Sequence, residues 1–458
     1  MPPPRTPQRS LRPSSSVDAT PYCRRIKKDR KVSVDPTASL PDDALARIFA
    51  GLSDTAAVVR CAATCRRWGH VVATSATIIS RSLPPLGRFM PELAVGFFHQ
   101  ETDLPAAPSW LPGFVATTSA ARFLGEPGQQ RLLRVEGLGD DSGILRHSRP
   151  VASRNGRLVL ELRSEGDGLR LAVCNPMMRL DNAVIVVPRL TSPEGGTIEE
   201  YGCALLTGQD LRLPRCNTFF RLLLVYNHQN RGGKNSTTVL RCYSSDTGRW
   251  GPEAECCVEI PSSNIRNIGQ AVVHRGVAFC PLDNGALGAR LDEIDDHGAV
   301  MDMHLVPYAY EEPHLCPEKR LLGISPDNRL LFFYTGIVGW KKQYMIANLS
   351  YFEFAEEDNI RTGKERGMRE EEHVPMPQMK LSHDNTAIKL RWLGEKSGHV
   401  LFTMGRPSGH KGTFVLNLHD KTVTRVAIFG DSWKNLLGYE MDMATYLSCL
   451  LPRPNRPT

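Results

Sequence analysis

The sequence predicts a multidomain α+β protein, with a small three-helix domain followed by a mainly β domain. We interpret the β domain as a β-propeller of about six irregular blades. Two observations support this prediction. Residues 39–82 show the apolar spacing of short amphipathic helices. Residues 110–432 consist of short strand-like runs separated by turn signals, in units that recur at roughly 45 to 55 residues, a spacing typical of propeller blades. A β-sandwich or barrel is the second choice.

The first helix is indicated by the stretch Leu40–Leu52. Pro41 suits the first position of a helix, and the two aspartates that follow it complement the positive end of the helix dipole. Leu45, Ile48, Phe49 and Leu52 then recur at positions i, i+3, i+4 and i+7. This spacing places their side chains on one apolar face of a helix.

Two further helices are expected before residue 82. Ser53-Asp54 can cap the second helix, which carries Val58, Val59, Cys61 and Ala62. The third helix begins near Cys65-Arg66-Arg67-Trp68 and continues through two valines. Gly69 within it costs about 1 kcal/mol of helix stability relative to alanine.

The β domain is read from apolar runs that end at turn residues. Asn155-Gly156 is a strong hairpin signal that precedes the run Arg157–Arg163. Other strands are expected at 114–118, 169–174, 220–226, 238–243, 271–279, 330–334, 344–349, 400–404 and 413–418. The charged stretch Glu356–Glu372 interrupts this rhythm, and we expect a solvated excursion there.

These patterns divide the chain into five parts. We expect a disordered basic leader at 1–37, a helical domain at 38–82, a linker at 83–109, the β domain at 110–432, and a tail at 433–458 with a short amphipathic helix.

Charge and cysteine usage indicate the compartment. Much of the net charge of +7 lies in the leader, where Arg24–Lys31 is either a nuclear import signal or a solvated basic tail. A plastid transit peptide is a weaker alternative. The 12 cysteines show no C-x-x-C pair, and no apolar h-region follows Met1, so we expect reduced thiols and a nuclear or cytoplasmic protein. No apolar run approaches the roughly 18 residues of a membrane-spanning helix.

The helical stretch resembles an F-box. The matching residues are Leu40-Pro41, the spaced aliphatic positions up to Leu52, and Val58 to Trp68 with its basic pair before the tryptophan. Gly69 and the two valines at 58–59 are minor departures from the family pattern. The β domain resembles the propeller-like associated domain of plant-type F-box proteins, through Cys174-Asn175-Pro176 and the stretch Tyr243–Trp250, whose tryptophan we expect to pack between blades.

The resemblance implies a non-catalytic substrate-receptor subunit of an SCF-type ubiquitin ligase, which directs proteins to proteasomal degradation. Its partners would be a Skp-family adaptor, through it a cullin and a RING protein, and an unidentified protein substrate bound by the β domain. The residues implied to form or support the adaptor surface are Leu40, Pro41, Leu45, Ile48, Phe49, Leu52, Val58, Val59, Cys61, Cys65 and Trp68.

Physical reasoning supports a partner for these helices. A unit of about 40 residues buries too little surface to be stable alone. Covering five or six large apolar side chains yields on the order of 10 kcal/mol before the cost of association. The alternative is that the helices dock only on the chain's own β domain.

Signals for other functions are weak. Gly137–Gly143 and Gly405–Lys411 miss the spacing of nucleotide-binding loops, and no nucleophile elbow or H-E-x-x-H zinc motif occurs. Asp295–His297, His274 and Cys256-Cys257 are more typical of loops, turns and packing than of metal or catalytic sites. The sequence therefore predicts no catalytic residue, cofactor or metal. The alternatives left open are a propeller-type enzyme or carbohydrate-binding protein with non-functional N-terminal helices, and a basic-tailed scaffold that binds nucleic acid.

Overall fold

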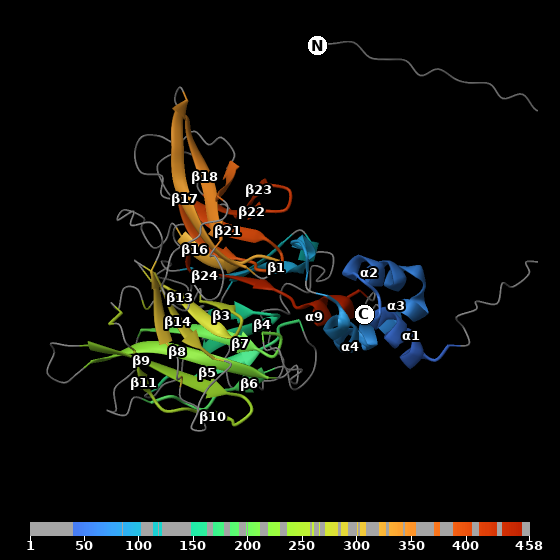
Figure 1. Cartoon of the computed structure of the whole chain (residues 1–458), viewed down its shortest axis with the longest axis horizontal. Helices are drawn as coiled ribbons and strands as arrows, with labels where there is room; N and C mark the ends of the chain where they lie inside the picture. Colours follow the sequence, from blue (N-terminus) through green and yellow to red (C-terminus); the bar gives the residue numbers. More distant parts are fainter. Residues whose placement is uncertain are drawn as a thin grey trace, which may run out of the picture.

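The computed structural model describes residues 40–450 apart from a set of internal gaps. The gaps are 85, 102–112, 118, 121–147, 163–167, 178–183, 192–197, 199, 211–218, 230–235, 257–258, 261–264, 266–270, 283–284, 292–299, 301–302, 308–319, 327–328, 342–343, 354–370, 376–387, 405–411 and 428–432. The predicted basic leader and nearly all of the charged stretch 356–372 lie outside the described residues. Figure 1 shows the N-terminal helices at one end of the molecule and the strands at the other.

Four short helices make up the N-terminal domain, where the sequence predicts three. They are α1 (Asp42–Ala50), α2 (Thr55–Thr64), α3 (Arg66–Thr74) and α4 (Ala76–Ser82). Asp54 caps α2, because its carboxylate accepts a hydrogen bond from the Ala57 N–H at 2.6 Å. The Cys65 thiol accepts from the Trp68 N–H at 3.5 Å at the start of α3. Among the helices of the described residues, none has the length and hydropathy needed to cross a bilayer.

Five blades form the propeller, each an antiparallel sheet in which the strands follow their order in the sequence. The first and second blades contain β3 (Ser148–Arg154), β4 (Arg157–Leu162), β5 (Leu171–Cys174) and β6 (Val184–Val186), then β7 (Tyr201–Thr207), β8 (Phe220–Gln229), β9 (Ser236–Ser244) and β10 (Arg249–Trp250), with β11 (Ala254–Glu255) beside β9.

The other three blades follow the same plan. They contain β12 (Val272–His274), β13 (Val277–Pro281), β14 (Gly285–Arg290) and β15 (Met303–Pro307); β16 (Arg320–Ile324), β17 (Leu330–Lys341), β18 (Tyr344–Glu353) and β19 (Glu371–Pro375); and β20 (Ile388–Leu393), β21 (His399–Met404), β22 (Gly412–Asn417) and β23 (Thr422–Ala427). The predicted strands in these regions are confirmed.

A three-stranded sheet closes the ring between the fifth blade and the first. Its order is β2 (Gly113–Ala116), β1 (Ala94–Glu101) and β24 (Trp433–Glu440), so it joins the two ends of the β domain. Its strand β24 lies between β20 and β3. At Gly438 the approach is so close that a Cβ atom would lie 2.0 Å from the Trp392 ring.

This sheet corrects three predictions. The propeller has five blades of four or five strands rather than about six, because the described residues at the remaining position in the ring form a sheet of three strands. The predicted linker 83–109 contains β1, so the β domain begins earlier than expected. The start of the predicted tail is strand β24, and the helix comes later, as α9 (Met443–Ser448). The pairing of β1 with β24 joins segments that are remote in sequence, and local patterns do not reveal it.

The cores of the propeller lie between neighbouring blades. Successive residues of one strand point to opposite faces of the sheet. Leu321 accordingly packs with the fifth blade and Leu322 with the third. Trp250 lies between the first two blades as predicted, since its Nε1–H donates to the Pro188 carbonyl at 2.8 Å and its ring packs on Tyr243. The hairpin at Asn155-Gly156 has the expected left-handed turn, with φ of 47° and 76°.

Candidate partner-binding surface

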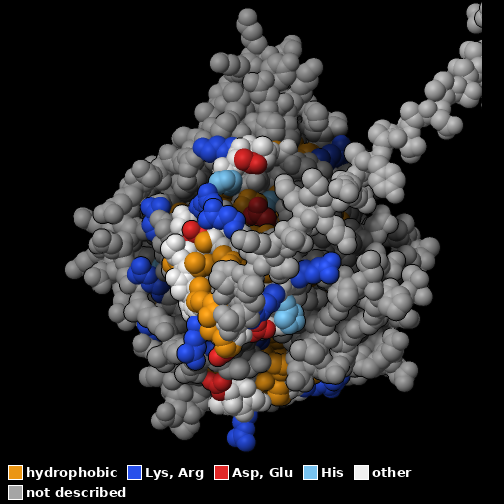
Figure 2. Space-filling view, turned by 90° about the vertical axis from the view of Figure 1, so that its right-hand side faces the viewer, with side chains coloured by type: hydrophobic (Ala, Val, Ile, Leu, Met, Phe, Trp, Pro, Cys, Tyr) orange, Lys and Arg blue, Asp and Glu red, His pale blue; other side chains and the backbone are white. Residues whose placement is uncertain are grey.

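Helix α1 presents apolar side chains both inward and outward. Leu45 and Phe49 are 1% and 2% exposed and belong to the core of the helical domain. Ile48 lies on the same helix but is 51% exposed. Figure 2, which looks onto the end of the molecule where these helices lie, shows hydrophobic side chains gathered in a strip with Lys and Arg side chains beside it. A contiguous apolar strip at the surface, unlike a single exposed side chain, marks a site that another molecule can cover.

The residues predicted for the adaptor surface fall into three classes. The fully buried ones, which can support a surface but not touch a partner, are Leu45, Phe49 and Val58. The partly buried ones are Leu40, Leu52, Val59, Cys61 and Trp68. The exposed ones are Pro41, Ile48 and Cys65.

Contacts between α1 and α3 hold the two halves of this surface together. Trp68 packs edge-on against Phe49, with the ring centroids 5.3 Å apart. Arg67 donates to the Asp42 carboxylate at 2.8 Å and to the Leu40 carbonyl oxygen, and so fixes the chain where it enters α1. Arg67, the second residue of the basic pair before the tryptophan, therefore positions the Leu-Pro start of the pattern.

Within the described part of the chain, α1 and α2 make no extensive contact with a strand of the propeller. The main contacts of the helical domain with the rest of the chain run from α3 and α4 to α9. Helices α1 and α2 pack mainly on α3 and α4. Docking of the helices on the chain's own β domain therefore does occur, but it leaves Ile48 uncovered.

Comparison with protein families accounts for this arrangement. The model of the F-box-like family matches residues 37–77, which include α1, α2 and α3. Residues 37–77 are an F-box-like domain. Among curated proteins, no sequence matches the chain.

Solved structures match the chain at low similarity. An α-L-arabinanase from Penicillium chrysogenum complexed with arabinobiose is 11% identical at a TM-score of 0.31, over 65% of this chain and 92% of that one. The AtxE2 isopeptidase (10%, TM-score 0.24) and prolyl oligopeptidase B from Galerina marginata (12%, TM-score 0.26) match over 62% and 60% of this chain. The chain spans only 40% and 37% of these two peptidases. Such values give no basis for transferring an activity.

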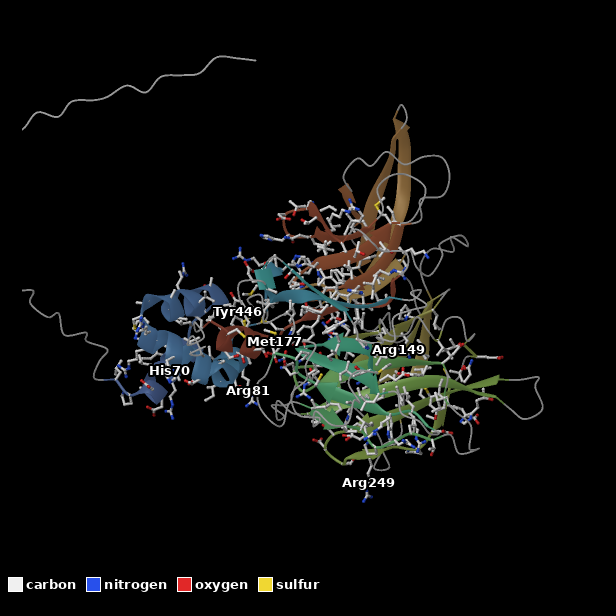
Figure 3. All side chains as sticks on the ribbon, turned by 180° about the vertical axis from the view of Figure 1, so that it is seen from behind. His70, Arg81, Arg149, Met177, Arg249 and Tyr446 are labelled. Atoms are coloured by element: carbon white, nitrogen blue, oxygen red, sulfur yellow. The ribbon has the colours of Figure 1, made fainter. Side chains whose placement is uncertain are left out.

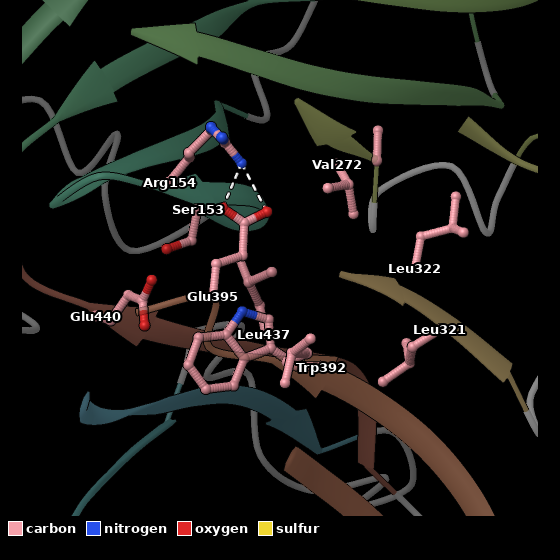
Figure 4. Close-up of a pocket in the computed structure, with 11 residues that line it drawn as sticks. Ser153, Arg154, Val272, Leu321, Leu322, Trp392, Glu395, Leu437 and Glu440 are labelled. Atoms are coloured by element: carbon pink, nitrogen blue, oxygen red, sulfur yellow. Dashed lines mark hydrogen bonds and ion pairs between the residues drawn. The ribbon is translucent and has the colours of Figure 1, made fainter. Parts of the chain in front are cut away.

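A buried ion cluster lies where the inner strands of the propeller meet. Arg154, at the end of β3, is only 10% exposed and pairs with Asp210 at 2.8 Å and Glu395 at 2.6 Å. Its guanidinium also donates to the Val273 carbonyl at 2.5 Å. Arg154 thus connects the first blade to the second, third and fifth. Figure 4 shows Arg154 above Glu395, with Glu440 and Trp392 beside them.

The carboxylates of this cluster titrate differently. Burial would raise the pKa of Asp210, but Arg154 and Thr207 more than offset this and hold its pKa below the usual value. Burial raises the pKa of Glu395, although Arg154 opposes the effect. Burial also raises the pKa of Glu440, against the opposing effects of Lys396 and the backbone N–H groups of the same turn. The ion pairs of this cluster link strand ends of different blades. The cavity beside them, of about 40 Å³, has room for little more than water.

The weak catalytic and metal candidates gain no support. His274 is buried at the end of β12, next to the Arg275-Gly276 turn. Cys256 is partly buried beside the core between the second and third blades. Asp295–His297, Gly137–Gly143 and Gly405–Lys411 lie outside the described residues. Within the described part of the chain, no group of three or more His, Cys, Asp or Glu side chains is arranged to hold a metal ion.

Sequence reasoning missed two features of the structure. It did not identify Ile78, which is 57% exposed on α4 just beyond the family match. It also did not identify Arg154, because an arginine at a strand end has the local pattern of a solvated residue. Its acidic partners are 56 and 241 positions away in sequence, and only the ring brings them together.

Proposed function

We propose that this chain is a substrate-receptor subunit of an SCF-type ubiquitin ligase. In this proposal the F-box-like domain binds a Skp-family adaptor, which links it to a cullin and a RING protein. The propeller holds the protein to be ubiquitylated. The observation that supports the proposal most is the F-box-like match over α1–α3 together with the 51% exposure of Ile48 on the side away from the propeller.

The energetics require several residues to act together. Covering one Ile-sized side chain contributes about 1.5–3 kcal/mol, whereas association costs about 4–15 kcal/mol. Ile48 alone cannot supply this. With the partly buried Leu40, Leu52 and Val59 covered as well, the surface can outweigh the cost.

The proposal assigns no chemical step to the chain itself. Its contribution is proximity, because a bound substrate is presented to the conjugating enzyme at a high effective concentration. These partners lead us to propose a nuclear or cytoplasmic location.

The test is adaptor binding by the full-length chain, measured by calorimetry with an Ile48→Asp variant. Because Ile48 is exposed, the variant should fold normally, and we expect its affinity for the adaptor to fall roughly 10- to 150-fold. Leu45→Asp is a poor probe, since it would place a charge in the core of the domain.

Val186→Asp is the matched control. Val186 is also an exposed aliphatic side chain, 36% accessible, but it lies on β6 of the propeller. We expect its affinity for the adaptor to equal that of the wild type. Equal binding by the Ile48→Asp variant and the wild type would contradict the proposal.

A further inference from the structure

Helix α9 lies between the F-box-like domain and the propeller and contacts both. We propose that α9 fixes the orientation of the F-box-like domain on one face of the propeller, with Asn175 and Gln209 as positioning residues. The consequence of this fixed orientation for ubiquitin transfer rests on the proposed function. The fixed orientation itself is argued from the contacts described below.

The apolar side of α9 joins two domains into one core. Leu447 and Tyr446 are 0% and 6% exposed. They belong to the cluster that also contains Ile79 of α4, Leu158 of β4 and Phe98 of β1. Figure 3 shows Tyr446 and Met177 at the junction of the helices and the propeller. The F-box-like domain thus shares its hydrophobic core with the first blade and the closing sheet.

The polar side of α9 is held by the second and fifth blades. Asp442 caps the helix, accepting from the Thr445 N–H at 2.6 Å. The second oxygen of Asp442 accepts from the Gln209 side-chain amide at 3.1 Å. The side-chain oxygen of Gln209, Oε1, in turn accepts a hydrogen bond from Lys396 Nζ at 2.8 Å. The cap of α9 is therefore tied to the turns that follow β7 and β20.

The first blade holds α9 through Asn175. The Asn175 side-chain amide donates to Thr445 Oγ1 at 3.3 Å. Its carbonyl oxygen accepts from the Met177 N–H at 3.1 Å and lies 3.2 Å from the Tyr439 hydroxyl of β24. That hydroxyl donates to the Gly156 carbonyl oxygen at 2.9 Å. One asparagine thus ties the end of β5 to the closing strand and to α9.

These attachments lie on a single face of the propeller. The turns at Gly156, Gln209 and Lys396 each follow the first strand of a blade, and such turns emerge on the same side of the ring. Asp442 lies directly on the first of them, since a Cβ at Gly156 would be 3.0 Å from the Asp442 nitrogen.

The other connection between the two domains is also held in place. The segment between α4 and β1 is pinned where the Met90 N–H donates to the Lys396 carbonyl at 2.8 Å. Leu93, just before β1, is fully buried. With both connections packed against the same turns, the F-box-like domain cannot rotate freely. The face on which the inner strands begin is consequently held away from the adaptor surface.

Hydrogen exchange on the full-length chain tests whether Asn175 and Gln209 hold α9 in place. In an Asn175→Ala/Gln209→Ala variant, we expect the amides of α9 to exchange at least tenfold faster, including the Tyr446 N–H that bonds to the Asp442 carbonyl. Exchange in α1 and α2 should change less than twofold. Unchanged α9 exchange would overturn the inference.

Asn417→Ala is the matched control. The Asn417 side-chain oxygen also accepts a hydrogen bond from the backbone N–H two residues later, that of His419, at 3.0 Å, but Asn417 is the last residue of β22 in the fifth blade. We expect wild-type exchange in α9 for this variant. If the double variant does not fold, Gln209→Ala alone removes an exposed contact and should still accelerate exchange at the start of α9.

A reconstituted ligase tests the functional consequence. With a fixed orientation, ubiquitin should attach to a narrow set of propeller lysines, and in the double variant to a broader set, at unchanged adaptor affinity. An unchanged set despite faster α9 exchange would overturn the positioning role. Failure of the wild-type chain to bind the adaptor would contradict the proposed function alone, because the exchange experiment needs no partner.

Discussion

The F-box-like domain leaves the apolar Ile48 51% exposed at its surface, whereas the propeller buries the charged Arg154 at its centre. The propeller can do so because three other blades supply partners for the guanidinium of Arg154. The small domain has too few elements to cover all its apolar side chains. The contrast indicates that the propeller pairs the buried charge of Arg154 within its own ring, and that the F-box-like domain relies on neighbours, with α9 on one side and a proposed adaptor on the other.

Replacement of Arg154 should have the largest effect on stability. Arg154→Met leaves Asp210 without its buried ion pair, and we expect the free energy of unfolding to fall by about 3–5 kcal/mol. Denaturant titration of the full-length chain measures this. Arg149→Met is the comparison, because Arg149 pairs with Glu161 at a more exposed site and should lose no more than about 2 kcal/mol. Similar losses of unfolding free energy in both variants would show that the buried, central position of Arg154 adds nothing to the stability its ion pairs provide.

Truncation of a side chain on the buried side of α1 should destabilise the fold, whereas truncation on the exposed side should leave stability nearly unchanged. Leu45→Ala removes a side chain that is 1% exposed, so we expect a loss of about 2–5 kcal/mol in the stability of the F-box-like domain. Ile48→Ala should change stability by no more than about 0.5 kcal/mol. Thermal unfolding followed by circular dichroism measures both. A destabilised Ile48→Ala variant would mean that the exposed side chain already serves this chain's own fold.

This division of α1 shows where sequence prediction stops. The spacing of Leu45, Ile48 and Phe49 was enough to predict one apolar face. On a helix, however, Ile48 lies about 60° to one side of Leu45 and Phe49 about 40° to the other. Packing against α3 and α4 buries the Phe49 side and leaves the Ile48 side open. Which edge of an apolar face is covered depends on neighbouring helices, and their placement is not a local property.

The closing sheet shows that strand formation, too, depends on neighbouring elements that local sequence does not reveal. The apolar residues near Leu436 suit a helix or a strand equally well, and a short run cannot distinguish them. They form β24 because β1, at the other end of the domain, offers an edge for pairing. By contrast, the hairpin at Asn155-Gly156 was predictable, since asparagine and glycine readily adopt the left-handed backbone that this turn requires.

The contact between the two regions can be probed at Gly156. Gly156→Ala combines a left-handed φ of 76° with a Cβ only 3.0 Å from the Asp442 nitrogen. Gly248→Ala has a similar φ of 66° but open space around the Cβ. The backbone strain of about 1–2 kcal/mol should be common to both. We therefore expect Gly156→Ala to be the less stable variant and to accelerate hydrogen exchange in α9. Equal behaviour would indicate that α9 does not rest on this turn.

The smallest expected effect concerns Glu440, which lies beside the ion cluster at the end of β24. Its oxygen Oε2 accepts from the backbone N–H groups of Lys396 at 3.3 Å and Ser397 at 3.1 Å. A glutamine oxygen can accept both bonds. Because burial raises the pKa of Glu440, the ionised side chain is disfavoured in the folded state at neutral pH. Glu440→Gln removes that penalty, and we expect stability at pH 7 to rise by up to about 1 kcal/mol.

The sign of the pH dependence separates Glu440 from Asp210. A carboxyl group whose folded pKa is raised makes the protein less stable as pH rises from its unfolded value through its folded value. The Glu440→Gln variant should lack this part of the decline above about pH 4.5. Asp210 acts in the opposite sense, since its lowered pKa gives stability above its unfolded value that is lost as pH falls through its folded value. Stability curves of wild type and variant between pH 4 and 8 therefore converge at the acid end if Glu440 is protonated there in both states. A variant that loses more than about 2 kcal/mol at pH 7 would show instead that the fold requires the ionised carboxylate.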